Sequence, residues 1–196
     1  MNFRVLPIAA AFIIGLAACE NRGAADSVGS TDDAAPSSTV PTGEPEPAVP
    51  ATTPDVSGDG VALGLLGAVN KHEIAAAQQA RSNGVSGDVL AYADLMEKDH
   101  GENQVKTEAL GQLAEDAEVA AQKEKGNAEL AQLGTLEGDA YKAAYIDAMI
   151  KGHTEVLALI DTRLLPLATG PDVEAHLATT RKHVAHHLEQ AKALKK

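Results

Sequence analysis

The stretch from residue 139 to residue 165 reads DAYKAAYIDAMIKGHTEVLALIDTRLL, and its pattern decides the fold class. Apolar residues recur along it at intervals of three and four, which is the spacing of one face of an α-helix. A helix is expected to end at the proline and glycine that follow, Pro166 and Gly170. We therefore predict an amphipathic helix from Asp139 to about Leu165, with a buried face made of Ile146, Met149, Ile150, Val156, Leu157, Ile160 and Leu164.

Three other segments of the chain show the same spacing. We predict helices over about 61–82 and 86–120, and a last helix that begins at Pro171, a residue suited to a first helical turn. Residues 125–138 carry leucines between glycines and predict a short extra helix or crossover between the second and third long helices. The sequence has no alternating pattern long enough for a strand. These features predict an all-α, antiparallel four-helix bundle over residues 61–196.

The composition agrees with a helical core and excludes one class of partner. The 196 residues include 28 acidic and 16 basic side chains, which give a formal net charge of -12. The two phenylalanines, Phe3 and Phe12, precede the predicted helices, and the chain has no tryptophan. The core must therefore consist mainly of aliphatic side chains. An acidic chain without a basic stripe lacks the positive charge that nucleic-acid backbones require, so we expect no nucleic-acid partner.

The first 18 residues have the pattern of a secretory signal peptide. Arg4 precedes an apolar run over residues 5–16, and small residues follow. This run is too short to span a bilayer. It ends in Leu-Ala-Ala-Cys at positions 16–19, which resembles the lipobox of bacterial lipoproteins, where the cysteine is acylated and becomes the first residue of the mature chain. The alternative is an ordinary signal peptide in which Cys19 occurs by chance.

Acylation of Cys19 would attach the protein to a membrane. Cys19 is the only cysteine, so no internal disulfide can form. Glu20 follows it, and by resemblance to the sorting rules of enterobacterial lipoproteins the absence of aspartate at this position favours the outer membrane. We therefore expect a cell-envelope protein that is anchored through acylated Cys19 and faces the periplasm. The sequence indicates no particular protein partner.

Residues 19–60 are predicted to form a disordered tether between the lipid and the bundle. From Glu20 to Gly60 the chain contains six prolines, eight acidic residues and one arginine, but no leucine, isoleucine, methionine or aromatic residue. Such a segment cannot bury enough apolar surface to offset the entropy lost on ordering. A flexible coil of this length spans roughly 35 Å.

Several ionisable residues occupy positions where the helical spacing places the core. Glu73 lies in the first predicted helix, His100 in the second and His153 in the third. In the last helix, His183 and His187 are four residues apart and share one face at its apolar border. A buried carboxylate or imidazole is costly unless it is paired or binds a metal. Helical bundles build metal sites from such inward-facing residues, and these donors suit iron, manganese, zinc or copper.

A purely structural role explains the same residues. Glu73 and one histidine would then form a buried ion pair, another histidine would be a satisfied core residue, and the histidines of the last helix would line a solvated rim. In that case the buried polar groups only fix the register of the helices.

The sequence favours a non-enzymatic role over catalysis. Di-iron carboxylate proteins of the bundle class need two Glu-x-x-His pairs, and this chain has only the pair formed by Glu97 and His100. No free cysteine remains after acylation of Cys19, and no serine lies in a Gly-x-Ser-x-Gly turn. The chain therefore lacks the usual nucleophiles.

Three short motifs occur in order along the predicted helices. Residues 96–100 read MEKDH, residues 144–153 read AYIDAMIKGH, and Leu188 follows His187. They resemble the Met-x-x-Asp-His, Tyr-(x)3-Met-(x)3-His and His-Leu motifs of the bacterial "domain of unknown function 4142" family, described as predicted outer-membrane proteins with a ferritin-like bundle. The resemblance covers roughly residues 61–194. It implies a ferritin-like fold and an envelope location, and it brings no established activity.

By matching position, the resemblance marks Glu73, Asp99 and the three histidines His100, His153 and His187. Together with the helical spacing, it predicts a transition-metal site in the core of the bundle. The proposed ligands are Glu73, His100, His153 and His187, and the further candidates are Asp99, Glu97 and His183. The alternative is a non-catalytic structural or stress-related envelope module.

Overall fold

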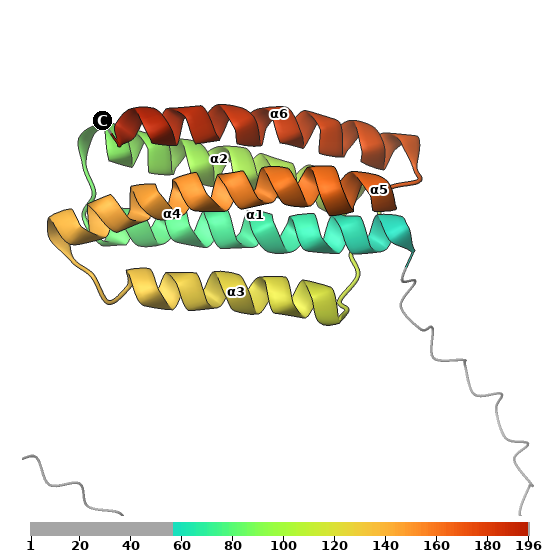
Figure 1. Ribbon diagram of the computed structural model, residues 1–196, viewed down its shortest axis with the longest axis horizontal. Coiled ribbons are helices and arrows are strands. Elements are labelled where there is room, and N and C mark those ends of the chain that lie inside the picture. Colours follow the sequence, from blue (N-terminus) through green and yellow to red (C-terminus); the bar gives the residue numbers. More distant parts are fainter. Residues whose placement is uncertain (1–56, 196) are drawn as a thin grey trace, which may run out of the picture. The chain divides into compact units, whose positions relative to one another are not determined.

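The computed structural model describes residues 57–195, and these form an all-α bundle without any β-strand (Figure 1). The prediction of the fold class is confirmed. The elements in chain order are α1 (Gly58–Ser82), α2 (Gly87–Ala109), α3 (Ala117–Leu133), α4 (Gly138–Leu159), the π-helical turn η1 (Ile160–Leu164), α5 (Leu165–Leu167) and α6 (Pro171–Leu194).

The connectivity is that of a bundle with one crossover. Helices α1 and α2 form one antiparallel pair, and α4 and α6 form another (Figure 1). Between the pairs, α3 carries the chain back along the outside of α1, so α2 and α4 run in the same direction. A single long crossover of this kind is the connectivity of ferritin-like bundles.

Two predicted boundaries between the second and third long helices were wrong. The second helix ends at Ala109, not near Ala120, and the extra segment is a 17-residue helix that begins at Ala117. The side chain of Asp116 caps this helix by accepting a hydrogen bond from the backbone N–H of Val119 at 2.9 Å. The segment between the helices stays close to α1, because the N–H of Ala114 donates to the carbonyl of Gly60.

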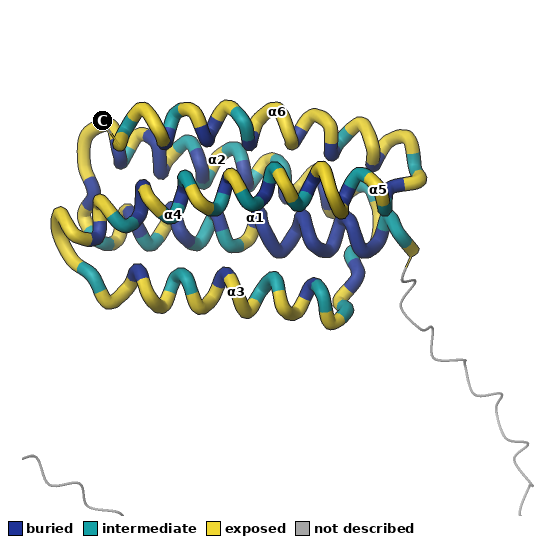
Figure 2. The backbone as a smooth tube through the Cα atoms, viewed as in Figure 1, coloured by how far each residue is buried: buried dark blue, intermediate teal, exposed yellow. Residues whose placement is uncertain are grey.

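The N-terminal half of α1 is buried on every side, as the dark blue part of the tube shows (Figure 2). The connection between α2 and α3 covers the side of α1 that the four-helix arrangement would leave to solvent. Glycine makes this approach possible: a Cβ at Gly64 would lie 2.5 Å from the carbonyl oxygen of Ala114, and one at Gly67 would lie 2.7 Å from Leu113. A helix surrounded in this way is apolar all round, as residues 60–69 are.

A polar layer divides the core into two apolar clusters. One cluster contains residues 61–69 of α1 and Val156 of α4, and the other contains Ala76 of α1 and Met149 of α4. Eight buried polar or charged residues interrupt the apolar core, and most of them lie between the two clusters: Asn70, Glu73, His100, Gln104, Thr107, His153, Thr180 and His187.

The end of the bundle at which α1 begins is closed by Asp59. Its carboxylate accepts hydrogen bonds from the backbone N–H groups of Thr169 and Gly170, in the connection to α6. These bonds lower the pKa of Asp59 below its ordinary value of 3.8. The N-terminus of α1 is thereby tied to the connection that precedes the last helix.

Within residues 57–195, no helix combines the length and the apolar character needed to cross a lipid bilayer. The predicted signal peptide, the acylated Cys19 and residues 19–56 of the predicted tether lie outside the described residues. The predicted end of the tether was wrong, because α1 begins at Gly58 and residues 58–60 belong to this helix.

Candidate metal centre

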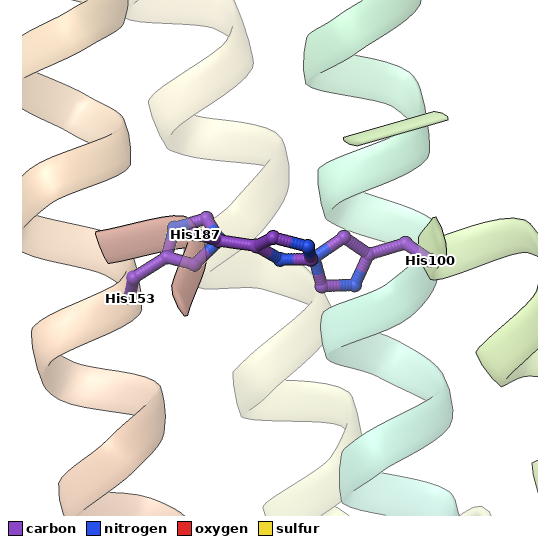
Figure 3. A group of neighbouring side chains, drawn as sticks. All are labelled: His100, His153 and His187. Carbon is purple, nitrogen blue, oxygen red and sulfur yellow. The ribbon is translucent and has the colours of Figure 1, made fainter. Parts of the chain in front are cut away.

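Three buried histidines from three helices meet in the polar layer. His100 comes from α2, His153 from α4 and His187 from α6, and their exposed fractions are 4%, 1% and 2% (Figure 3). The ring centroids lie 5.5–5.9 Å apart. One nitrogen of each ring lies within 4.8 Å of the corresponding nitrogens of the other two.

The hydrogen-bond partner of His153 decides which of its nitrogens is free. Nδ1 lies 2.8 Å from the backbone carbonyl of Met149, one helical turn earlier. A carbonyl oxygen only accepts, so Nδ1 carries the hydrogen and the lone pair of the neutral ring is on Nε2. Nε2 is buried and has no hydrogen-bond partner among the described residues.

A hydrogen bond also fixes the tautomer of His187, but it is formed by Nε2 instead of Nδ1. Nε2 donates to the carboxylate of Asp99 over 3.1 Å, which leaves the lone pair on the buried, unpartnered Nδ1. Burial raises the pKa of Asp99, but the hydrogen bonds from His187 and Lys98 outweigh this effect and bring the pKa below its ordinary value. Asp99 is therefore an anion beside the cluster.

A chain of amides orients His100. Its Nδ1 lies 3.0 Å from the side-chain oxygen of Asn70, whose amide nitrogen donates to Asn103 at 2.8 Å. Asn103 in turn donates to the hydroxyl of Thr180 at 2.7 Å. The chain joins α1, α2 and α6, and its direction places the oxygen of Asn70 against an N–H of His100. The lone pair of His100 is then on Nε2, which has no partner.

Two of the three histidines, His100 and His187, are held in the neutral form that binds metals. Burial lowers the pKa of His100 well below its ordinary value, and positive charge on His153 or His187 would lower it further. Burial also lowers the pKa of His187 to about 4, although Asp99 opposes this shift. Near neutral pH, the two rings therefore present lone pairs instead of N–H groups.

Glu73 lies beside the cluster and not within it. Its Oε1 is 4.0 Å from Nδ1 of His153, the nitrogen that donates to the backbone carbonyl of Met149. Its Oε2 is buried and has no partner among the described residues. Glu73 and Asp99 thus flank the three rings as two carboxylates, each next to a different histidine.

The other two candidate ligands are not part of the cluster. Glu97 is partly exposed, and its carboxylate accepts hydrogen bonds from Gln78 and Arg81. His183 is exposed at the mouth of a cavity of about 10 Å³, which His100 and His187 also line. That volume corresponds to roughly one water molecule.

Sequence reasoning missed the amides that orient His100. A signal for Asn70 existed, because it is the first polar residue after the apolar run over residues 61–69. No comparable signal marks Asn103 or Thr180, since an asparagine or threonine on a helix is usually exposed.

Comparison with known proteins places the chain in a family. The family described as "Domain of unknown function (DUF4142)" matches residues 44–194. The chain belongs to this family. The match includes all of the histidines and carboxylates discussed above, so the candidate centre lies within the DUF4142 domain. Searches among curated proteins and among solved structures gave no match.

Proposed function

We propose that this protein binds one transition-metal ion through His100, His153 and His187, in a bundle that acylated Cys19 anchors to the bacterial envelope. The observation that carries the proposal is the direction of the hydrogen bonds. Each ring uses one nitrogen to donate to a fixed acceptor, and the other nitrogen of each ring is buried and unpartnered. The three rings bring one nitrogen each within 4.8 Å of one another. Metal-binding histidines are commonly oriented by such a second hydrogen bond.

The electrostatics of the polar layer favour a cation at this point. Three converging lone pairs repel one another, and an apolar cluster lies on either side of them. A divalent ion would accept all three lone pairs. Asp99, which binds His187, and Glu73, which lies next to His153, supply two negative charges that balance such an ion.

The donor set argues against manganese among the candidate metals, and zinc and copper are the ions we test first. Three imidazole nitrogens suit zinc, copper, iron and nickel, whereas manganese prefers carboxylate and water oxygens. Tetrahedral zinc with bonds of about 2.0–2.1 Å needs nitrogens about 3.3 Å apart, so the rings would have to move inward by roughly 1 Å. The cavity beside His100 and His187 gives a fourth ligand, such as water, a place at the ion.

The test is a metal titration of the full chain produced without a histidine tag. We expect zinc or copper to bind with a stoichiometry of one in calorimetry, and to raise the melting temperature by mass action. His153→Ala should weaken binding at least 100-fold. His186→Ala is the matched control, because His186 is exposed and adjacent to His187 but lies outside the cluster.

The structural alternative forecasts a different result. If the polar layer only fixes the helix register, His153→Ala lowers the free energy of unfolding by roughly 1–3 kcal/mol equally with and without metal. A wild-type chain whose stability does not respond to zinc, copper, iron or manganese would refute the metal proposal.

A further inference from the structure

A second feature of the polar layer lies away from the three histidines, between α1, α3 and α4. There the bundle contains a cavity of about 290 Å³. Helix α1 contributes Val69, His72 and Glu73 to its wall, and α3 contributes Lys125, Gly126 and Glu129. The three histidines of the candidate metal centre do not line it.

Glu73 is the carboxylate of this cavity that is almost fully buried and lacks a hydrogen-bond partner. It is 2% exposed, and its Oε2 has no hydrogen-bond partner among residues 57–195. Its Oε1 lies 4.0 Å from His153, so the two oxygens have different surroundings. A buried carboxylate with a free oxygen is costly unless a cation or a hydrogen-bond donor comes to it.

The remaining charged groups of the cavity form two ion pairs, although Nδ1 of His72 is buried and has no hydrogen-bond partner among the described residues. His72 lies 3.0 Å from Glu129, and Lys125 lies 2.6 Å from Glu155. Burial lowers the pKa of His72, but the hydrogen bond to Glu129 and the charge of Glu73 raise it above its ordinary value. Three carboxylates line the cavity against Lys125 and His72, so the lining keeps one net negative charge even when His72 is protonated, and this charge attracts cations.

The other wall of the cavity is apolar and suits an organic ligand. Val69, Val156 and Leu159 line it, and Gly152 leaves the space next to the carboxylate open. No group of three metal-binding side chains collects here in the part of the chain that the structure describes. A metal ion would therefore find too few ligands, whereas a small ammonium ion with a hydrocarbon chain matches both walls.

We infer that this cavity binds a small alkylammonium ion. Its ammonium group pairs with Oε2 of Glu73, and its hydrocarbon chain lies along Val69, Val156 and Leu159. The site is separate from the three histidines, so it goes beyond the proposed metal binding.

Gly152 offers a way to block the cavity without replacing Glu73. A Cβ at this helical position would lie 3.6 Å from Oε1 of Glu73, which is an ordinary contact. Gly152→Ala should therefore fold and still bind the ligand. Gly152→Leu adds three carbons beyond that Cβ and should fill the space beside the carboxylate.

The experiment titrates the full chain with n-butylammonium and, separately, with n-butanol, in the presence of a chelator. We expect saturable binding of butylammonium and at least tenfold weaker binding of butanol, which has a similar size but no charge. Glu73→Gln and Gly152→Leu should each weaken butylammonium binding at least tenfold, while Gly152→Ala should keep it.

Three outcomes would overturn the inference: equal binding of butanol and butylammonium, unchanged binding by Glu73→Gln, or no saturable binding at all. If Glu73→Gln fails to fold, the comparison of Gly152→Leu with Gly152→Ala decides. A zinc titration of Gly152→Leu separates the two sites, because this variant should lose the ammonium ion and keep the metal.

Discussion

At the level of single residues, hydrogen-bond direction determines the chemistry of the polar layer. A carbonyl, a carboxylate and an amide oxygen each accept a hydrogen from one ring, of His153, His187 and His100 respectively. If any acceptor were replaced by a donor, the ring would change tautomer and turn an N–H group toward the other two rings. The function proposed for the histidines therefore depends on groups that do not themselves bind the ion.

A second residue-scale effect is the pH dependence that Asp59 confers on stability. Its pKa lies below the ordinary 3.8 because Thr169 and Gly170 donate to the charged carboxylate. The folded state thus holds its proton less tightly than the unfolded state. The stabilisation is present above the unfolded pKa and is lost as the pH falls through the folded pKa.

We therefore predict that Asp59→Asn lowers the free energy of unfolding by about 1 kcal/mol at pH 7, because it replaces a charged acceptor of two backbone N–H groups by a neutral one. The difference from wild type should shrink as the pH falls below about 4 and through the still lower pKa of Asp59 in the folded protein. Urea unfolding curves of both proteins across this range measure it. A difference that stays constant would show that Asp59 acts through packing instead of charge.

At the level of the elements, the packing requires glycine at one helical position and not at another. Gly64 lets the connection between α2 and α3 lie against α1, since a Cβ there would be 2.5 Å from a backbone oxygen of Ala114. Gly101 of α2 has no atom within 4 Å of the position of its Cβ, so nothing in the packing requires glycine there. Substitutions at Gly101 therefore measure the backbone entropy that glycine loses in a helix, and substitutions at Gly64 measure the close packing that glycine allows.

Gly101→Ala should raise the free energy of unfolding by about 0.5–1 kcal/mol, because alanine loses less backbone entropy than glycine on entering a helix. Gly64→Ala should lower it by about 1–3 kcal/mol, because the connection must move away from α1. Urea denaturation measures both variants against wild type. Equal effects of the same sign would contradict the close packing of the connection on α1.

The elements also show which parts of the structure were predictable from the sequence. Helical spacing located Glu73, His100 and His153, because a regular helix projects every position onto a known face. It failed at Leu110 and Ala114, which were assigned to the second helix and instead lie in the connection that covers α1. These two residues are apolar because they pack against the core around α1. Outside a helix, buried residues do not recur at regular intervals, so helical spacing could not place them.

The convergence of the three rings could only be predicted in part. The sequence placed ionisable groups in the core of three helices, but the crossover helix α3 reverses the chain between α2 and α4. The relative positions of His100 and His153 along the bundle axis depend on the course of α3. Likewise, the separation of Glu73 from the three rings depends on side-chain conformations that no spacing encodes.

At the level of the whole molecule, the polar layer connects two sites that face different sides. The cavity lined by His100, His183 and His187 lies between α2 and α6, and the cavity lined by Glu73 lies between α1, α3 and α4. His153 belongs to the three-histidine cluster and is also the histidine next to Glu73. A positive charge bound on one side therefore lies close to the carboxylate that serves the other, so the two sites are expected to influence each other electrostatically.

The proposed envelope location gives the final prediction, which concerns Cys19, outside the described residues. The residues at positions 16–19 place this cysteine at the end of an apolar signal core. Acyl chains contribute about 0.8 kcal/mol for each methylene group buried in the bilayer, so a chain acylated at Cys19 should partition into a detergent phase. Cys19→Ala should move the protein to the aqueous phase while the helical content, measured by circular dichroism, stays the same. Partition into detergent by the variant would show that something other than acylation of Cys19 holds the chain at the membrane.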